Sequence, residues 1–148
     1  MRIADLIKPT GVGRPGMRVR DIFQLCVEAD VPGIPYVDQN GDMHGKLSIR
    51  HMLKESCIPD FMVNYAHFLG DALDHLSISE ETVRQVLAYP VEDFILPQTP
   101  QATSNTPFSK ALAIMEEQDT TYLFVVDDGI YKGTISIMGI AHAMLENT

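Results

Sequence analysis

The sequence has no tryptophan, only two cysteines, and no apolar run long enough to cross a bilayer. Cys26 and Cys57 are too few and too far apart for a disulfide framework or a Cys-x-x-Cys redox or zinc motif. The N-terminus also lacks the long apolar stretch of a secretory signal. These absences predict a soluble cytoplasmic protein without a membrane partner.

Basic residues are scarce as well. The chain has 11 lysines and arginines against 20 aspartates and glutamates, a net charge of −9 that argues against nucleic acid as a partner. The charge is uneven, because residues 1–54 hold eight basic and six acidic side chains while residues 55–148 hold three and fourteen. A small anion would favour the first half, unless these charges only cover a solvated surface.

What the chain does contain is an internal repeat, with three segments that recur in the same order. Two pairs are offset by 88 residues and the middle pair by 89. The pairs are Ile3–Pro9 with Val91–Pro97, Val19–Asp38 with Phe108–Asp127, and Gly45–Ile49 with Gly133–Ile137. The chain therefore carries two diverged copies of one unit.

Each copy has the same predicted elements. In the first, apolar periodicity predicts a helix over residues 18–29, and Ile34–Val37 is a short apolar strand that runs into the tight-turn dipeptide Asn40-Gly41. A second strand ends at Ser48, and a helix follows to about Glu55. The second copy repeats this order with the helix from Thr106 as N-cap and Pro107 as first residue, the strand Tyr122–Val126, the turn Asp128-Gly129, a strand ending at Ser136, and a helix from Ile137 to about Glu146.

Residues 55–90 have no counterpart elsewhere in the chain. Apolar residues at three- and four-residue steps predict one helix between Phe61 and Leu76. Ser79 predicts the cap of a second helix, which closes before Pro90. Neither copy has enough apolar surface to fold well alone, so we expect the two copies to pack on each other.

The order helix, strand, tight turn, strand, Gly-x-x-Ser, helix resembles the CBS domain, named after cystathionine β-synthase. That family carries a motif Gly-h-x-Ser/Thr-x-x-Asp, where h is apolar, and the matching stretches are Gly45–His51 and Gly133–Gly139. The resemblance covers residues 3–54 and 91–146. It implies an α/β (α+β) fold, a tandem CBS pair of two pseudo-twofold-related β-α-β-β-α units. The expected divisions are repeat 1 at 1–54, a helical insert at 55–90 and repeat 2 at 91–148.

CBS pairs commonly bind adenosine ligands between the two repeats, so the resemblance implies AMP, ADP, ATP or S-adenosylmethionine as ligand. Ser48 and Ser136 would lie near ribose or phosphate at a helix N-terminus. Lys46 and Arg50 beside Ser48 could contact a phosphate. The remaining residues that the resemblance places around the ligand are Thr10, Ile34, Pro35, Tyr36, His51, Thr103, Tyr122, Leu123 and Phe124.

Both copies depart from the motif at its acidic position. His51 and Gly139 stand where the family's aspartate binds ribose hydroxyls. Glycine cannot make that contact and histidine can make only part of it. The first copy keeps Lys46 and Arg50 beside Ser48, so it is the better candidate for an anion site. The glycine-rich stretch 10–16 is read as a connector, with a phosphate-binding loop as the alternative.

The sequence contains no pattern that predicts a metal site or a catalytic site. His67, Asp71 and His75 share one helix face but span too far to close round a single ion, so no metal is expected. No nucleophile and base occur in a recognisable arrangement, and we expect no enzyme activity. A small enzyme using His51 as a base is the weakest hypothesis.

In the family the helices after the Gly-x-x-Ser strands form a homodimer face, here Met52, Leu53, Ile140, Met144 and Leu145.

The sequence thus predicts a non-catalytic, dimeric regulatory module that senses a small anionic ligand, an adenosine nucleotide, between the repeats. Such a module would act on an unidentified protein target. The alternative is a structural dimerisation module whose clefts have lost ligand binding, which the missing acidic residues of both motifs favour.

Overall fold

The computed structural model describes residues 1–58 and 78–148. The predicted helix from Phe61 to Leu76 and the group His67, Asp71 and His75 lie outside the described residues. In chain order the described elements are the 3-10 helix η1 (Ile3–Asp5), α1 (Val19–Ala29), β1 (Gly33–Val37), β2 (Met43–Ser48), α2 (Ile49–Cys57), α4 (Glu80–Ala88), the 3-10 helix η4 (Val91–Phe94), β3 (Gln101–Ala102), α5 (Phe108–Glu117), β4 (Tyr122–Asp127), β5 (Ile130–Ser136) and α6 (Ile137–Glu146).

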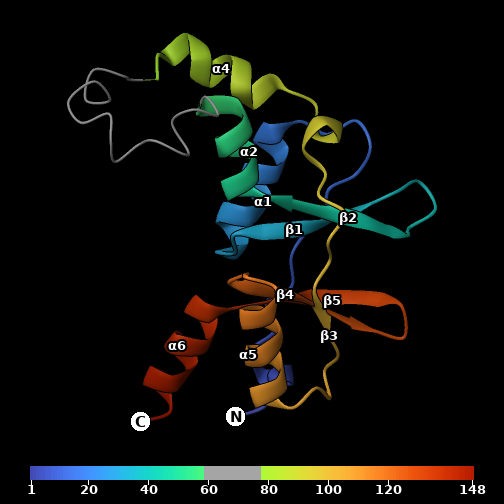
Figure 1. Ribbon diagram of the computed structural model, residues 1–148, viewed down its shortest axis with the longest axis vertical. Helices are drawn as coiled ribbons and strands as arrows, with labels where there is room; N and C mark the ends of the chain where they lie inside the picture. Colours follow the sequence, from blue (N-terminus) through green and yellow to red (C-terminus); the bar gives the residue numbers. More distant parts are fainter. Residues whose placement is uncertain (59–77) are drawn as a thin grey trace.

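The described elements form two α+β halves, as the sequence predicts. In the first, β1 and β2 pair antiparallel with α1, α2 and α4 around them (Figure 1). In the second, β4 pairs antiparallel with β5 and parallel with the short β3, next to α5 and α6. Asp128 and Gly129 both adopt positive φ between β4 and β5, which is the requirement of the tight hairpin turn that their sequence indicates.

Two local predictions differ from the structure. Pro107 is the N-cap of α5 rather than its first residue, and Thr106 does not cap the helix. The Thr106 hydroxyl instead accepts a hydrogen bond from the Thr103 backbone N–H at 2.9 Å, which holds it in the preceding turn. The opening strand of the first unit is reduced to one parallel bridge between Gly13 and Tyr36, whereas the second unit has β3 at that place.

The opening segment of each copy crosses to the other copy. The N-terminal segment starts in the lower half of Figure 1 and runs up to α1, while the segment after η4 runs down to β3. Lys8 exchanges two backbone hydrogen bonds with Thr134 of β5, at 3.0 and 2.9 Å. Leu96 exchanges two with Lys46 of β2, at 3.0 and 2.8 Å. These four residues occupy matching positions of the repeat, so the exchange is reciprocal.

The two hydrophobic cores reflect this exchange. Val91 and Phe94 pack in the first core with Ile22 and Leu47, although the sequence repeat assigns them to the second copy. Ile3 packs in the second core with other residues of the lower half. Each core therefore depends on a segment from the other copy, which fits the expectation that neither copy is stable alone. The divisions at residues 54 and 90 stay predictions.

None of the helices within residues 1–58 and 78–148 has the length and apolar character that a bilayer-spanning helix requires.

Candidate functional site

Ser48 and Ser136 each lie where a strand passes into a helix, at the N-cap positions of α2 and α6. The Ser48 hydroxyl accepts a hydrogen bond from the His51 backbone N–H at 3.4 Å, and the Ser136 hydroxyl accepts one from Gly139 N–H at 3.0 Å. The Ile49 N–H donates to the Pro32 carbonyl at 3.1 Å and the Ile137 N–H to the Thr121 carbonyl at 2.9 Å. Each first turn therefore leaves one N–H, that of Arg50 or Met138, without a partner within its helix. Both helix starts could therefore receive an anion.

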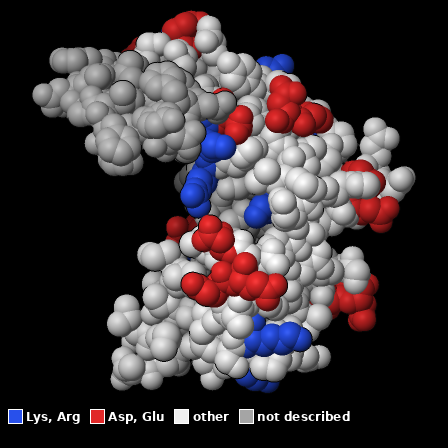
Figure 2. Space-filling view, viewed as in Figure 1, with Lys and Arg blue, Asp and Glu red and all other residues white. Residues whose placement is uncertain are grey.

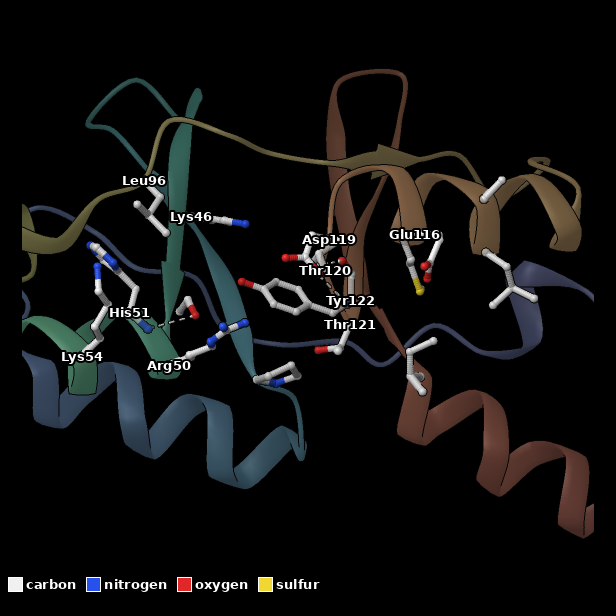
Figure 3. Close-up of a pocket in the computed structure, with 16 residues that line it drawn as sticks. Lys46, Arg50, His51, Lys54, Leu96, Glu116, Asp119, Thr120, Thr121 and Tyr122 are labelled. Carbon is white, nitrogen blue, oxygen red and sulfur yellow. Dashed lines mark hydrogen bonds between the residues drawn. The ribbon is translucent and has the colours of Figure 1, made fainter. Parts of the chain in front are cut away.

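A cavity of about 890 Å³ lies between the two units at the start of α2. Lys46, Ser48, Arg50, His51 and Lys54 come from the first unit, and Leu96 comes from the segment that crosses from the second (Figure 3). The facing wall is built from α5 and the loop to β4. Its residues are Leu112, Ala113, Met115, Glu116, Asp119, Thr120, Thr121 and Tyr122, with Ile137 of α6 and Pro32 completing the lining.

The cavity is divided by charge. Lysine and arginine side chains gather on the upper wall of the hollow in Figure 2, and acidic side chains lie on the lower wall. Among the lining residues, the first unit supplies Lys46, Arg50 and Lys54, while the second supplies Glu116 and Asp119. Partial burial lowers the pKa of Lys46. Within the described residues, neither Lys46 nor Arg50 forms an ion pair within 4.0 Å.

Tyr122 crosses from β4 into the first unit. Its ring lies under the Lys46 ammonium, whose nitrogen is 5.6 Å from the ring centroid, close enough for a cation–π attraction. The side chain is 6% exposed, and its buried hydroxyl forms no hydrogen bond of regular geometry among the described residues, although the Ser48 hydroxyl lies near it. Burial raises the pKa of Tyr122 to about 12, against the opposing effect of the nearby Ser48 hydroxyl.

The pseudo-equivalent cleft, at the start of α6, has a different chemistry. A cavity of about 570 Å³ there is lined by Ser136 and by the exposed apolar side chains Val27 and Met138. A neighbouring cavity of about 410 Å³ contains Lys8 and Gly139. The repeat offsets match Val27 with Glu116 and Met138 with Arg50, so these two charged positions of the first cavity are apolar in the second. The acidic position of Asp119 is kept, because its equivalent Asp30 also lines the second cavity.

The structure therefore brings together only part of the predicted set. Lys46, Ser48, Arg50, His51 and Tyr122 share the first cavity, and Ser136 lies in the other cleft. Thr10 lines a separate cavity of about 540 Å³, and its hydroxyl forms a hydrogen bond of 2.6 Å with the Tyr131 hydroxyl. The remaining predicted residues lie elsewhere: Thr103 is exposed in the turn before α5, and Ile34, Pro35, Tyr36, Leu123 and Phe124 are buried in β1 and β4. A ligand contact for any of these residues stays a prediction.

Sequence reasoning missed the acidic wall. Glu116 and Asp119 belong to no motif of the sequence, and they lie far from Ser48 along the chain. The repeat offset of 89 pairs Asp119 with Asp30, and both residues follow a helix with positive φ, at 50° and 54°. Such a conformation is unusual for a residue other than glycine. Asp119 lines the cavity in this conformation.

Within residues 1–58 and 78–148, no group of three or more His, Cys, Asp or Glu side chains is placed to hold a metal ion. His51 has Ser48 as its near neighbour in the cavity, but only the backbone of His51 bonds to that hydroxyl.

Comparisons with known proteins agree with this architecture. The family model for the CBS domain matches residues 91–146. A CBS domain-containing protein from Bacillus anthracis is 16% identical, with a TM-score of 0.64 over 100% of this chain and 95% of the other. One from Kribbella flavida is 17% identical, with a TM-score of 0.65 and coverage of 98% of each chain.

A third solved structure is that of CBSX2 in complex with AMP. It is 23% identical to this chain, with a TM-score of 0.63 over 99% of this chain and 97% of the other. At these identities the solved structures establish the shared fold. A search of curated protein sequences found no match.

Proposed function

We propose that this chain, which has a CBS domain at residues 91–146 and the fold of CBS-domain structures along its length, is a non-catalytic regulatory module. We further propose that it senses a small anionic adenosine ligand. The observation that carries the proposal is the cavity of about 890 Å³ between the units. Its upper wall combines the N-terminus of α2 with Lys46 and Arg50, a combination suited to a phosphate or carboxylate.

The position of the cavity supports a regulatory mechanism. Its lining comes from both units, so a bound ligand would contact the first unit through α2 and the second through α5 and β4. A ligand that binds one relative arrangement of the units better than another shifts the population toward that arrangement. The complex of CBSX2 with AMP supports an adenosine ligand for this fold. We propose a cytoplasmic protein that passes this shift to a protein target.

Replacing Ser48 by alanine tests the ligand. We expect AMP, ADP, ATP or S-adenosylmethionine to bind the full chain in calorimetric titrations, and Ser48→Ala to weaken that binding at least about fivefold, since one hydrogen bond is worth about 1 kcal/mol. Ser136→Ala is the matched control, because it removes the equivalent N-cap from α6 and leaves the first cavity intact. Absence of binding by all four ligands at millimolar concentration would contradict the proposal.

A second candidate function is dimerisation, which the exposed apolar residues of α6 favour. Two residues of the predicted dimer face, Met52 and Ile140, are instead buried in the two cores. Met138, Met144 and Leu145 are 74%, 54% and 77% exposed, and Ile137 is 40% exposed. Exposed apolar residues gathered on one helix mark a protein interface more often than chance. We propose a homodimer through this helix, which would serve either a sensing module or a purely structural one.

Leu145→Glu combined with Met138→Glu is expected to convert the dimer into a monomer in sedimentation experiments. A buried apolar interface cannot accept two unpaired carboxylates, whereas exposed positions of a monomer can. Ile130→Glu is the control, because Ile130 is 59% exposed at the start of β5 and lies outside α6. A wild-type chain that sediments as a monomer at all concentrations would exclude this interface.

A further inference from the structure

The charges of the first cavity oppose the preference of the helices that carry them. Arg50 and His51 stand in the first turn of α2, which has no acidic residue, although the positive end of a helix favours carboxylates. Glu116 and Glu117 stand in the last turn of α5, which has no basic residue, although the negative end favours cations. Both helix ends would be locally more stable with the reversed charges.

Local preferences that are broken in one place often mark a functional site. At the start of α2, the side-chain charge and the partial charge of the helix end are both positive. At the end of α5, the side-chain charges and the partial charge of the helix end are both negative. The repeat itself does not require this arrangement. At the equivalent positions of the other cleft stand Met138 for Arg50 and Val27 for Glu116.

Tyr122 gives an independent indication that a ligand completes this cavity. Its hydroxyl is buried without a hydrogen bond of regular geometry among the described residues, which is costly for a polar group. In Figure 3 the ring reaches from β4 toward the first unit, and the hydroxyl ends between the side chains of Lys46 and Arg50. The hydroxyl oxygen is covered in this structure, so a polar ligand group would become its partner once the ring turns toward the cavity.

We infer that the cavity selects a ligand carrying both charges, with an anionic group on the Lys46 and Arg50 side and a cationic group on Glu116 and Asp119. This inference rests on the proposed function and specifies the ligand class within it. A polyanion such as ATP would meet attraction from one wall and repulsion from the other. An adenosine derivative with an amino-acid group would satisfy both walls.

Titrations of the full chain with S-adenosylmethionine, AMP and ATP test the inference. S-adenosylmethionine carries a carboxylate together with ammonium and sulfonium groups, and the two nucleotides are anionic. We expect S-adenosylmethionine to bind most tightly, and Glu116→Gln and Asp119→Asn each to weaken it about fivefold, as for a partly exposed charge pair. The same substitutions should leave AMP and ATP binding unchanged or tighter, because they remove repulsion.

Two controls isolate the wall from the net charge. Glu117→Gln removes the same charge from α5 outside the cavity lining, and Asp30→Asn changes the residue equivalent to Asp119 in the other cleft. Neither should alter the order of the three ligands. If AMP or ATP binds more tightly than S-adenosylmethionine and neither substitution changes any affinity, the inference is wrong while the proposed function stands. If none of the three binds, both are wrong.

Discussion

Gly133→Ala is expected to lower the free energy of unfolding by about 3 kcal/mol or more, the largest effect expected of a glycine-to-alanine change among the glycines that the structure describes. A Cβ at Gly133 would lie 2.4 Å from the carbonyl oxygen of Lys8 and 2.8 Å from its carbonyl carbon. Those atoms belong to the segment that crosses from the first unit and bonds to Thr134. Backbone held by paired hydrogen bonds cannot move aside without losing them.

The measurement is urea unfolding of the full chain, with Gly129→Ala as control. Both glycines have positive φ, 152° at Gly133 and 79° at Gly129, so both substitutions introduce backbone strain. A Cβ at Gly129 meets nothing within 4 Å, so its cost should stay near 1 kcal/mol. Equal losses for the two variants would show that the crossing segment does not constrain Gly133.

The same contact explains the first glycine of each Gly-x-x-Ser motif. A Cβ at Gly45 would lie 2.5 Å from the carbonyl oxygen of Leu96, which crosses the first sheet as Lys8 crosses the second. The sequence showed both glycines and their alignment. It could not show that the repeat's opening segments are exchanged, because backbone pairing between distant segments leaves no periodic pattern in side chains.

The candidate site also depends on contacts between distant segments, which the sequence does not reveal. Ser48, Lys46 and Arg50 could be grouped from sequence because they are neighbours in one strand and the helix that follows it. Glu116 and Asp119 lie more than sixty residues away on a helix end whose polarity looks like ordinary solvation. Only the packing of the two units puts them opposite Arg50. Residues that line a cavity from one segment are therefore predictable here, and the facing wall is not.

The contact between Gly33 and Tyr122 shows how the two units come to differ while keeping one fold. The repeat offset matches these two residues with each other, and they meet where the units pack. A Cβ at Gly33 would lie 2.4 Å from the Tyr122 hydroxyl oxygen and 2.6 Å from the ring carbon that bears it. Two large side chains could not share this space, so a glycine in one copy allows a tyrosine in the other.

Gly33→Ala should therefore lower the free energy of unfolding by about 2 kcal/mol, the second-largest effect expected here. The Tyr122 ring is the end of a side chain, but at 6% exposure the neighbours that surround it prevent it from swinging away. A double-mutant cycle with Tyr122→Val in urea unfolding separates this collision from the intrinsic effect of alanine in a strand. Once the ring is absent, Gly33→Ala should be neutral or slightly stabilising, since alanine restricts the unfolded chain more than glycine does.

A cost for Gly33→Ala that is the same in both backgrounds would mean that the two units do not meet at this pair. A coupling of about 2 kcal/mol would identify Gly33 and Tyr122 as a contact through which a ligand beside Tyr122 can act on both units.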